Sequence, residues 1–180
     1  MRIIAGSRKG ARLFAPKGLD TRPTGDRVRE AAFNLIGPVD GADVLDLFAG
    51  SGAMGLEALS RGAARATFVE QDASAARTIK RNVDKLGLPG AVVLRDDARR
   101  KLAADAAAGR RYDLVLIDPP YRMLETYLPM LAEHLPSVLA PAAIAVVESD
   151  AREEPVLPLA VRTSRRYGSA RLTVYESAAR

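Results

Sequence analysis

Residues 44–55 read Val-Leu-Asp-Leu-Phe-Ala-Gly-Ser-Gly-Ala-Met-Gly, and the architecture of the whole chain can be worked out from them. The first five predict a buried strand, and a helix is expected over residues 56–61. Gly50, Gly52 and Gly55 fit the pattern G-x-G-x-x-G, whose glycines allow a tight turn and a close approach of backbone to ligand. The stretch therefore predicts a strand, a turn and a helix that bind a ligand at the helix N-terminus.

A second predicted strand, residues 66–69, runs into Glu70, eighteen residues after Gly52. A carboxylate at this place can bind both hydroxyls of a ribose. A dinucleotide and S-adenosylmethionine (AdoMet) both contain a ribose and compete for such a site. Asp46 favours AdoMet, because a carboxylate suits the ammonium group of that cofactor and repels a pyrophosphate. We expect AdoMet to lie against Asp46, Phe48, Gly50, Gly52 and Glu70.

A third predicted strand, residues 91–94, is followed by two carboxylates. Asp97 is expected to accept a hydrogen bond from the adenine amino group, beside Ala98, and Asp96 is the alternative. Asp97 also has the position of an N-cap for the next helix, a role that does not exclude the first.

The motif Asp118-Pro119-Pro120-Tyr121 follows an apolar strand predicted over residues 112–117. That strand should end at the carboxyl edge of a parallel sheet, where ligands bind. Two prolines make a stiff turn whose carbonyls have no local partners. Asp118 and a free carbonyl can then accept hydrogen bonds from one amino group, while the Tyr121 ring faces a planar base. The alternative is an Asp-Pro turn that only closes the strand.

Composition narrows the class of protein. The chain has 180 residues, 48% of them hydrophobic, which fits one globular domain. It has no cysteine and a single histidine, His134, so disulfides and thiolate chemistry are excluded and no metal site is expected. The apolar runs fall short of the roughly 18 residues that span a bilayer, and we expect a cytoplasmic monomer without a membrane partner.

Positive charge is concentrated at the N-terminus. Residues 1–29 contain eight basic and two acidic side chains, whereas the rest contains 19 basic and 20 acidic ones. This imbalance predicts a polyanionic partner, and the alternative is a solvated basic face. We expect residues 1–38 to form an RNA-contacting arm and helix, and residues 39–180 the catalytic domain. The candidate RNA ligands are Arg8, Lys9, Arg12, Arg22 and Arg27.

The remaining patterns complete one Rossmann-like α/β domain, a doubly wound and mostly parallel sheet with five strand-and-helix units. The N-terminal arm is expected to form a basic β-hairpin or extended arm, then a helix that Asp26 caps. A helix over residues 124–139 is expected to break at Pro129 or Pro136. The other expected elements are a helix over 74–86, a strand over 142–147 and a C-terminal antiparallel hairpin of 161–167 and 171–175.

Taken together, D-L-F-A-G-S-G, Glu70, Asp97 and D-P-P-Y resemble a class I AdoMet-dependent methyltransferase that acts on an amino group. The segment Arg22-Pro-Thr-Gly-Asp-Arg-Val-Arg-Glu30, with the C-terminal Tyr167-Gly168 and Leu172–Glu176, resembles the RsmD family of bacterial 16S rRNA (guanine-N2)-methyltransferases. The resemblance implies methylation of guanine 966 of 16S rRNA in the small ribosomal subunit. It also implies that Asp118, Pro119, Pro120 and Tyr121 hold a flipped guanine.

Three alternatives remain at this point. D-P-P-Y also suits a methylase of DNA adenine N6 or of protein glutamine N5. A non-catalytic RNA-binding module would use only the basic arm. A dinucleotide-dependent reductase would use only the glycine loop.

Overall fold

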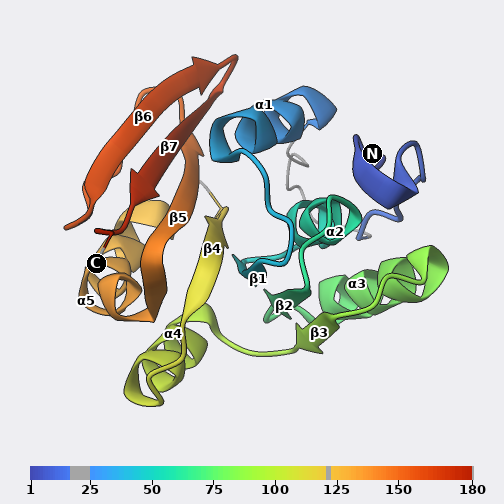
Figure 1. Ribbon diagram of the computed structural model, residues 1–180, viewed down its shortest axis with the longest axis horizontal. Helices are drawn as coiled ribbons and strands as arrows, with labels where there is room; N and C mark the ends of the chain where they lie inside the picture. Colours follow the sequence, from blue (N-terminus) through green and yellow to red (C-terminus); the bar gives the residue numbers. More distant parts are fainter. Residues whose placement is uncertain (17–24, 121–122, 180) are drawn as a thin grey trace.

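The computed structural model describes residues 1–16, 25–120 and 123–179. In this part of the chain, seven strands form one sheet with the order β3-β2-β1-β4-β5-β7-β6 (Figure 1). Its parallel strands are buried apolar runs, as expected for a sheet covered on both faces. These five parallel strands are β1 (Asp43–Leu47), β2 (Arg65–Val69), β3 (Ala91–Leu94), β4 (Tyr112–Ile117) and β5 (Leu139–Asp150).

Helices cover both faces of the sheet, which confirms the predicted doubly wound fold. One core lies between the sheet and α1 (Asp26–Ile36), α2 (Ala53–Ser60) and α3 (Ala73–Leu86). The other lies beneath α4 (Ala98–Ala107) and α5 (Leu124–Val138). The two helix layers are separate in Figure 1, where α3 and α5 lie at opposite ends.

The predicted C-terminal hairpin is confirmed. It consists of β6 (Ala160–Tyr167) and β7 (Ala170–Glu176), and β7 is antiparallel to both β5 and β6. Gly168, at a φ of 63°, occupies the left-handed conformation that the tight turn between them requires.

Two expectations are corrected. Five strand-and-helix units were expected, and the described residues contain four. The fifth parallel strand, β5, leads through a loop to β6, without a further helix. Helix α5 does not break, although each of Pro129 and Pro136 removes one backbone donor from its interior. Tyr127, Leu131 and Leu135 are buried along one stripe of α5, and this packing holds the helix on the sheet through both prolines.

The N-terminal segment folds back on itself, as predicted, but pairs through only one bridge, Arg2 with Arg12. Its turn contains a short 3₁₀ helix, Gly6–Arg8. Ile3 and Leu13 join the core of the α1, α2 and α3 layer. Helix α1 begins after Gly25, which makes no side-chain cap. Asp26, expected as the cap, instead pairs with Arg29 at 2.8 Å.

Candidate active site

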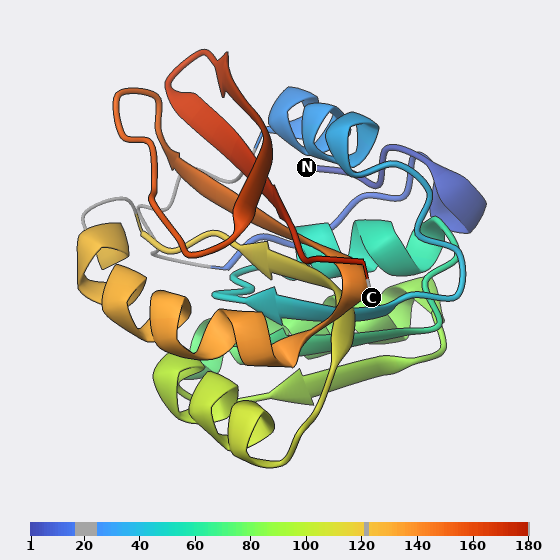
Figure 2. The same ribbon diagram turned by 60° about the vertical axis from the view of Figure 1, so that its left-hand side comes forward.

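The strand order reverses between β1 and β4, because β2 and β3 lie on one side of this pair and β5 on the other. In an open α/β sheet, ligands bind at such a switch point, beyond the carboxyl ends of the strands. Leu47 pairs with Ile117 at these ends. The glycine loop after Leu47 and the Asp-Pro-Pro turn after Ile117 therefore leave the sheet from neighbouring strands, ~4.8 Å apart. In Figure 2 the arrowheads of the parallel strands point toward this edge, on the left.

The glycines of the loop are required by its shape. Gly50 and Gly52 have φ angles of 57° and 80°, in the left-handed region that L residues avoid. A Cβ at Gly55 would lie 2.4 Å from the Phe68 ring, which is too close for any side chain. Gly55 thus lets α2 pack tightly on β2, and the loop is held close to the sheet.

Glu70 joins this loop to the end of β2. One carboxylate oxygen, Oε2, accepts a hydrogen bond from the Gly50 N–H at 2.8 Å, and Oε1 accepts from the Asp72 N–H at 2.8 Å. The half-buried carboxylate therefore lies beside the glycine loop, where a ribose acceptor is expected.

Asp46 lies behind the loop and is only 3% exposed. Its Oδ2 accepts a hydrogen bond from the Gly55 N–H at 2.9 Å. Burial, together with the nearby charge of Glu70, raises the pKa of Asp46 to about 7, against the lowering effect of the Gly55 hydrogen bond. A carboxyl with this pKa can become ionised when a cation approaches, and it disfavours a phosphate.

Asp97 and Asp96 lie at the end of β3. Asp97 is the N-cap of α4 and accepts hydrogen bonds from Arg99 N–H at 2.9 Å and Arg100 N–H at 3.2 Å, all through Oδ1. Asp96 pairs with the Arg100 side chain at 2.6 Å. Although burial acts in the opposite direction, this hydrogen bond and charge lower the pKa of Asp96. Each of the two carboxylates keeps its Oδ2 without a described partner, and Asp97 adjoins the buried Ala98.

The Asp118-Pro119-Pro120 turn follows β4. Asp118 is half-buried, Pro119 is buried and Pro120 is exposed. The Pro120 carbonyl accepts a hydrogen bond from the Met123 N–H at 2.7 Å, whereas the Pro119 carbonyl accepts none from a described backbone N–H. The predicted role of Tyr121 falls outside the described residues.

Sequence reasoning missed Tyr127, which belongs to the buried stripe of α5 and looks like an ordinary core residue. Its ring meets Phe48 edge-on at 4.6 Å between centroids, and the Arg99 guanidinium lies over the Tyr127 ring, 4.6 Å from its centroid. Phe48 has a φ of 62°, rare for a residue with a side chain and often found at functional sites. Burial, together with the charges of Asp97 and Glu70, raises the pKa of the Tyr127 phenol. Tyr127 thus lies among the expected cofactor residues.

The predicted RNA ligands are not gathered at one edge. Arg8 donates to the Leu86 carbonyl at 2.6 Å, at the last residue of α3, and Ser51 of the glycine loop contacts Met1 at 3.5 Å. The turn of the N-terminal segment, with Arg8 and Lys9, therefore lies at the amino edge of the sheet, to the right in Figure 2. Arg12 and Arg27 are exposed, and Arg22 falls outside the described residues.

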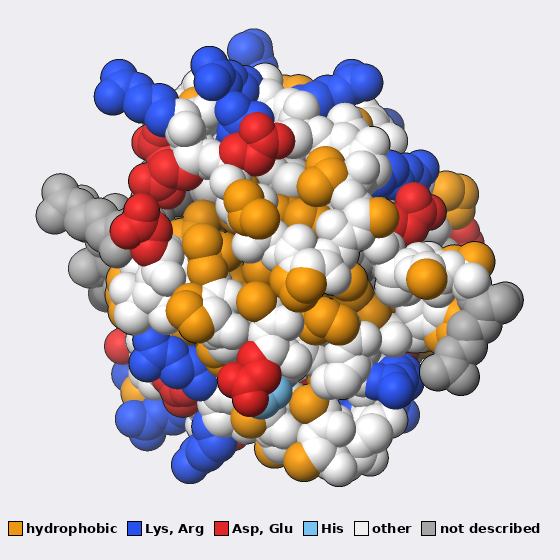
Figure 3. Space-filling model, turned by 90° about the vertical axis from the view of Figure 1, so that its left-hand side faces the viewer, with side chains coloured by type: hydrophobic (Ala, Val, Ile, Leu, Met, Phe, Trp, Pro, Cys, Tyr) orange, Lys and Arg blue, Asp and Glu red, His pale blue; other side chains and the backbone are white. Residues whose placement is uncertain are grey.

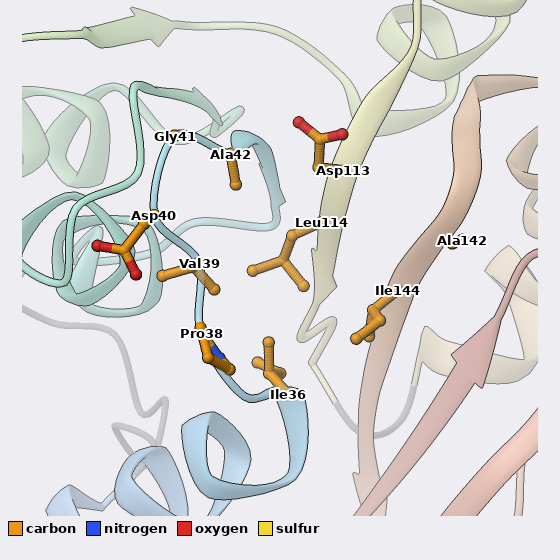
Figure 4. Close-up of a pocket in the computed structure, with 10 residues that line it drawn as sticks. All are labelled: Ile36, Pro38, Val39, Asp40, Gly41, Ala42, Asp113, Leu114, Ala142 and Ile144. Carbon is orange, nitrogen blue, oxygen red and sulfur yellow. The ribbon is translucent and has the colours of Figure 1, made fainter.

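A shallow hollow of about 420 Å³ lies at the opposite edge of the sheet from the glycine loop. It is lined by residues before β1 and within the first halves of β4 and β5, among them Ala42, Leu114 and Ile144 (Figure 4). None of the motif residues borders it. Within the described residues, no helix is long and apolar enough to cross a membrane, and no group of three metal-binding side chains is found.

Comparisons with known proteins agree with this geometry. The family model described as "Conserved hypothetical protein 95" matches residues 1–176. The Bacillus subtilis protein YlbH, which is named as an rRNA methyltransferase, is 41% identical over 184 residues, 98% of each chain. The ribosomal RNA small subunit methyltransferase D of Escherichia coli K12 is 41% identical over 153 residues, 83% of this chain and 75% of that protein. A solved Escherichia coli structure named as the methyltransferase yhhF superposes with a TM-score of 0.84 and 36% identity, covering 100% of this chain and 99% of that one.

Proposed function

Since the chain belongs to the RsmD family of rRNA methyltransferases, we propose that it methylates the exocyclic N2 amine of a guanine in 16S rRNA. AdoMet is the methyl donor. The family resemblance implies guanine 966 as the target, within the small ribosomal subunit in the cytoplasm.

The observation that carries this proposal is the pairing of Leu47 with Ile117. It brings the glycine loop, which suits AdoMet, next to the Asp-Pro-Pro turn, which suits an amino group. Methyl transfer needs donor and acceptor in line at ~3–3.5 Å, and holding them there can supply several kcal/mol of the barrier. Two neighbouring strand ends on rigid elements would support that arrangement.

The residues present fit AdoMet better than a dinucleotide. The buried carboxyl of Asp46, next to the N-terminus of α2, would repel a pyrophosphate and attract the ammonium group. Glu70 would bind the ribose, and Asp97 with Ala98 the adenine. AdoMet supplies an electrophilic methyl group on a sulfonium sulfur.

The acceptor turn prepares the nucleophile. The lone pair of a guanine N2 is delocalised into its ring, so the amine reacts only when that lone pair is turned out of the ring plane. Asp118 and the Pro119 carbonyl would accept its two N–H groups and direct the lone pair outward. Tyr121 would stack on the base, which must leave the RNA stack to reach the site. Asp118 would then take the proton that the amine loses.

The test is methyl transfer from labelled AdoMet to small ribosomal subunits that lack this modification, followed by nuclease mapping. Label recovered as N2-methylguanosine in 16S rRNA is the expected result. Label in adenine N6 or in a protein glutamine would support the rival methylase assignments. Absence of label in every substrate, despite measurable AdoMet binding, would refute the proposal and favour a non-catalytic RNA-binding module.

A further inference from the structure

We propose that the exposed face of α3, together with the N-terminal segment packed against it, forms the surface that binds the RNA backbone. The proposed function requires an RNA partner, and this inference rests on it. Residues 1–16 and 73–86 contain eight basic side chains and one acidic one, Asp84. The sequence places these two groups far apart in the chain, and the fold brings them together at the right of Figure 1.

The basic side chains of α3 form a continuous ridge. Arg77, Arg81 and Lys85 follow one another at a spacing of four residues, which places them on one side of the helix about 6 Å apart along its axis. Lys80 lies beside them, and all four side chains are exposed. Like charges at this spacing destabilise a helix by a few tenths of a kcal/mol per pair. A bound polyanion would remove that repulsion.

The N-terminal segment is fixed to this ridge. Asn82 is buried in α3 and binds both backbone groups of Phe14, accepting from its N–H at 2.8 Å and donating to its carbonyl at 3.0 Å. The Phe14 ring lies 3.6 Å from the Arg81 guanidinium and 4.6 Å from the Lys85 ammonium. Lys85 also donates to the Arg12 carbonyl at 2.7 Å. The arm and the helix therefore present one rigid basic surface.

This surface leads to the candidate active site. Helix α3 begins just after Glu70, at the carboxyl edge of the sheet, and ends at Leu86, where Arg8 binds. Its 14 residues span about 20 Å. The ridge thus runs from the cofactor edge toward Arg8 and Lys9, and it connects these distant cations to the site. An RNA strand whose target base enters the site could follow it.

Other faces of the molecule are less suited to RNA. The face around β6 and α5, seen in Figure 3, has hydrophobic side chains at its centre and acidic ones among the basic groups at its margin. On α3, by contrast, Arg77 and Lys80 form no ion pair with any residue in the described ranges. Unpaired exposed cations are the groups that release counterions when phosphates bind.

The test is the double variant Arg77→Gln, Lys80→Gln, because these two side chains make none of the contacts that hold the arm. Binding to a fluorescent 16S rRNA transcript is measured by anisotropy between about 0.05 and 0.5 M salt. Two lost phosphate contacts should reduce the slope of log affinity against log salt by about 1.5 and weaken binding about thirtyfold at 0.1 M salt. The affinity for AdoMet and the melting temperature should not change.

A matched control, Arg111→Gln with Arg162→Gln, removes two exposed cations that lie away from α3. Arg111 lies just before β4, and Arg162 lies in β6. The control should bind RNA like the unmodified protein. Equal losses in both double variants would mean that only net charge matters, and an unchanged slope in the α3 variant would show that RNA does not touch α3. Either result overturns the inference. A protein that binds RNA through α3 but transfers no methyl group would instead refute the proposed function alone.

Discussion

The Gly50 N–H donates a hydrogen bond to the Glu70 carboxylate over 2.8 Å, and this bond joins the glycine loop to the end of β2. Replacing Glu70 by Ala removes this bond, the bond from the Asp72 N–H and the expected acceptor for the ribose. Hydrogen bonds to charged groups contribute about 1.5–3 kcal/mol, so we expect the Kd for AdoMet to rise at least about tenfold. Isothermal titration calorimetry measures this. Glu133→Gln, a change at an exposed glutamate of α5, is the control, and an unchanged Kd in Glu70→Ala would exclude Glu70 from the cofactor site.

The strands of the sheet could be predicted well because each one is marked by an apolar run and by the residues directly before and after it. Strand β4 was expected over residues 112–117 and is found there. Charged residues before this apolar run and prolines after it mark where the strand begins and ends. The alternation of strands and helices also predicted a doubly wound sheet, in which the ends of the parallel strands share one edge, whereas the pairing of Leu47 with Ile117 comes from the structure. These features place both motifs at one edge before any side chain is considered.

Features that depend on packing between distant segments were not predictable. Pro129 and Pro136 predict a broken helix, whereas α5 is continuous because its buried stripe packs on the sheet. Tyr127 has the spacing of a core residue, and its contact with Phe48 depends on how α5 crosses the end of β1. The cations of α3 fit a solvated helix face in the sequence, and only the fold shows that the N-terminal segment packs against them.

The ionisation of Asp46 makes AdoMet binding depend on pH. In the free protein, burial raises the pKa of Asp46 to about 7. The ammonium group of AdoMet should favour the carboxylate and lower this pKa, so binding below pH 7 must release a proton. The affinity should therefore increase as the pH rises from about 5.5 to 7, by up to about tenfold per unit, and then level off. Calorimetry in buffers of different ionisation enthalpy detects the proton, and Asp46→Asn should lose both the release and the pH dependence. A pH-independent affinity in the unmodified protein would contradict the placement of Asp46.

Tyr127 offers a test that separates packing from hydrogen bonding. Tyr127→Phe keeps the edge-on contact with Phe48, so the free energy of unfolding should change by less than about 0.5 kcal/mol. Loss of the hydroxyl near Glu70 and Asp97 should weaken AdoMet binding about fivefold, the value of one ordinary hydrogen bond. Tyr127→Ala should also destabilise the fold, by about 3–5 kcal/mol. Equal AdoMet affinity in the Phe variant and the unmodified protein would make Tyr127 a packing residue only.

Asp118 should be needed for transfer and not for cofactor binding. Asp118→Ala removes the proposed acceptor for the guanine amine, and we expect loss of kcat by at least about a hundredfold, the scale of one positioned acid or base. The Kd for AdoMet should stay within about twofold, because the glycine loop is untouched. Asp118→Asn keeps one acceptor oxygen and separates hydrogen bonding from proton removal. Near-normal turnover in the Ala variant would remove the central claim about D-P-P-Y.

Glu57 should be required for stability, because it holds the N-terminal segment on α2 from a fully buried position. Its carboxylate accepts from the N–H groups of Ile4 at 2.8 Å and Ala5 at 3.0 Å, and it lies 3.7 Å from the buried Arg29 guanidinium. Glu57→Gln removes the buried carboxylate that pairs with Arg61 at 2.7 Å and leaves Arg29 with Asp26 as its ion-pair partner. Removing one partner of a buried ion pair costs up to about 3–5 kcal/mol. Urea unfolding should show this loss, while Glu30→Gln, at the exposed neighbour of Arg29, should change the free energy of unfolding by less than about 0.5 kcal/mol. An unchanged free energy of unfolding in Glu57→Gln would show that Glu57 does not hold the N-terminal segment on α2.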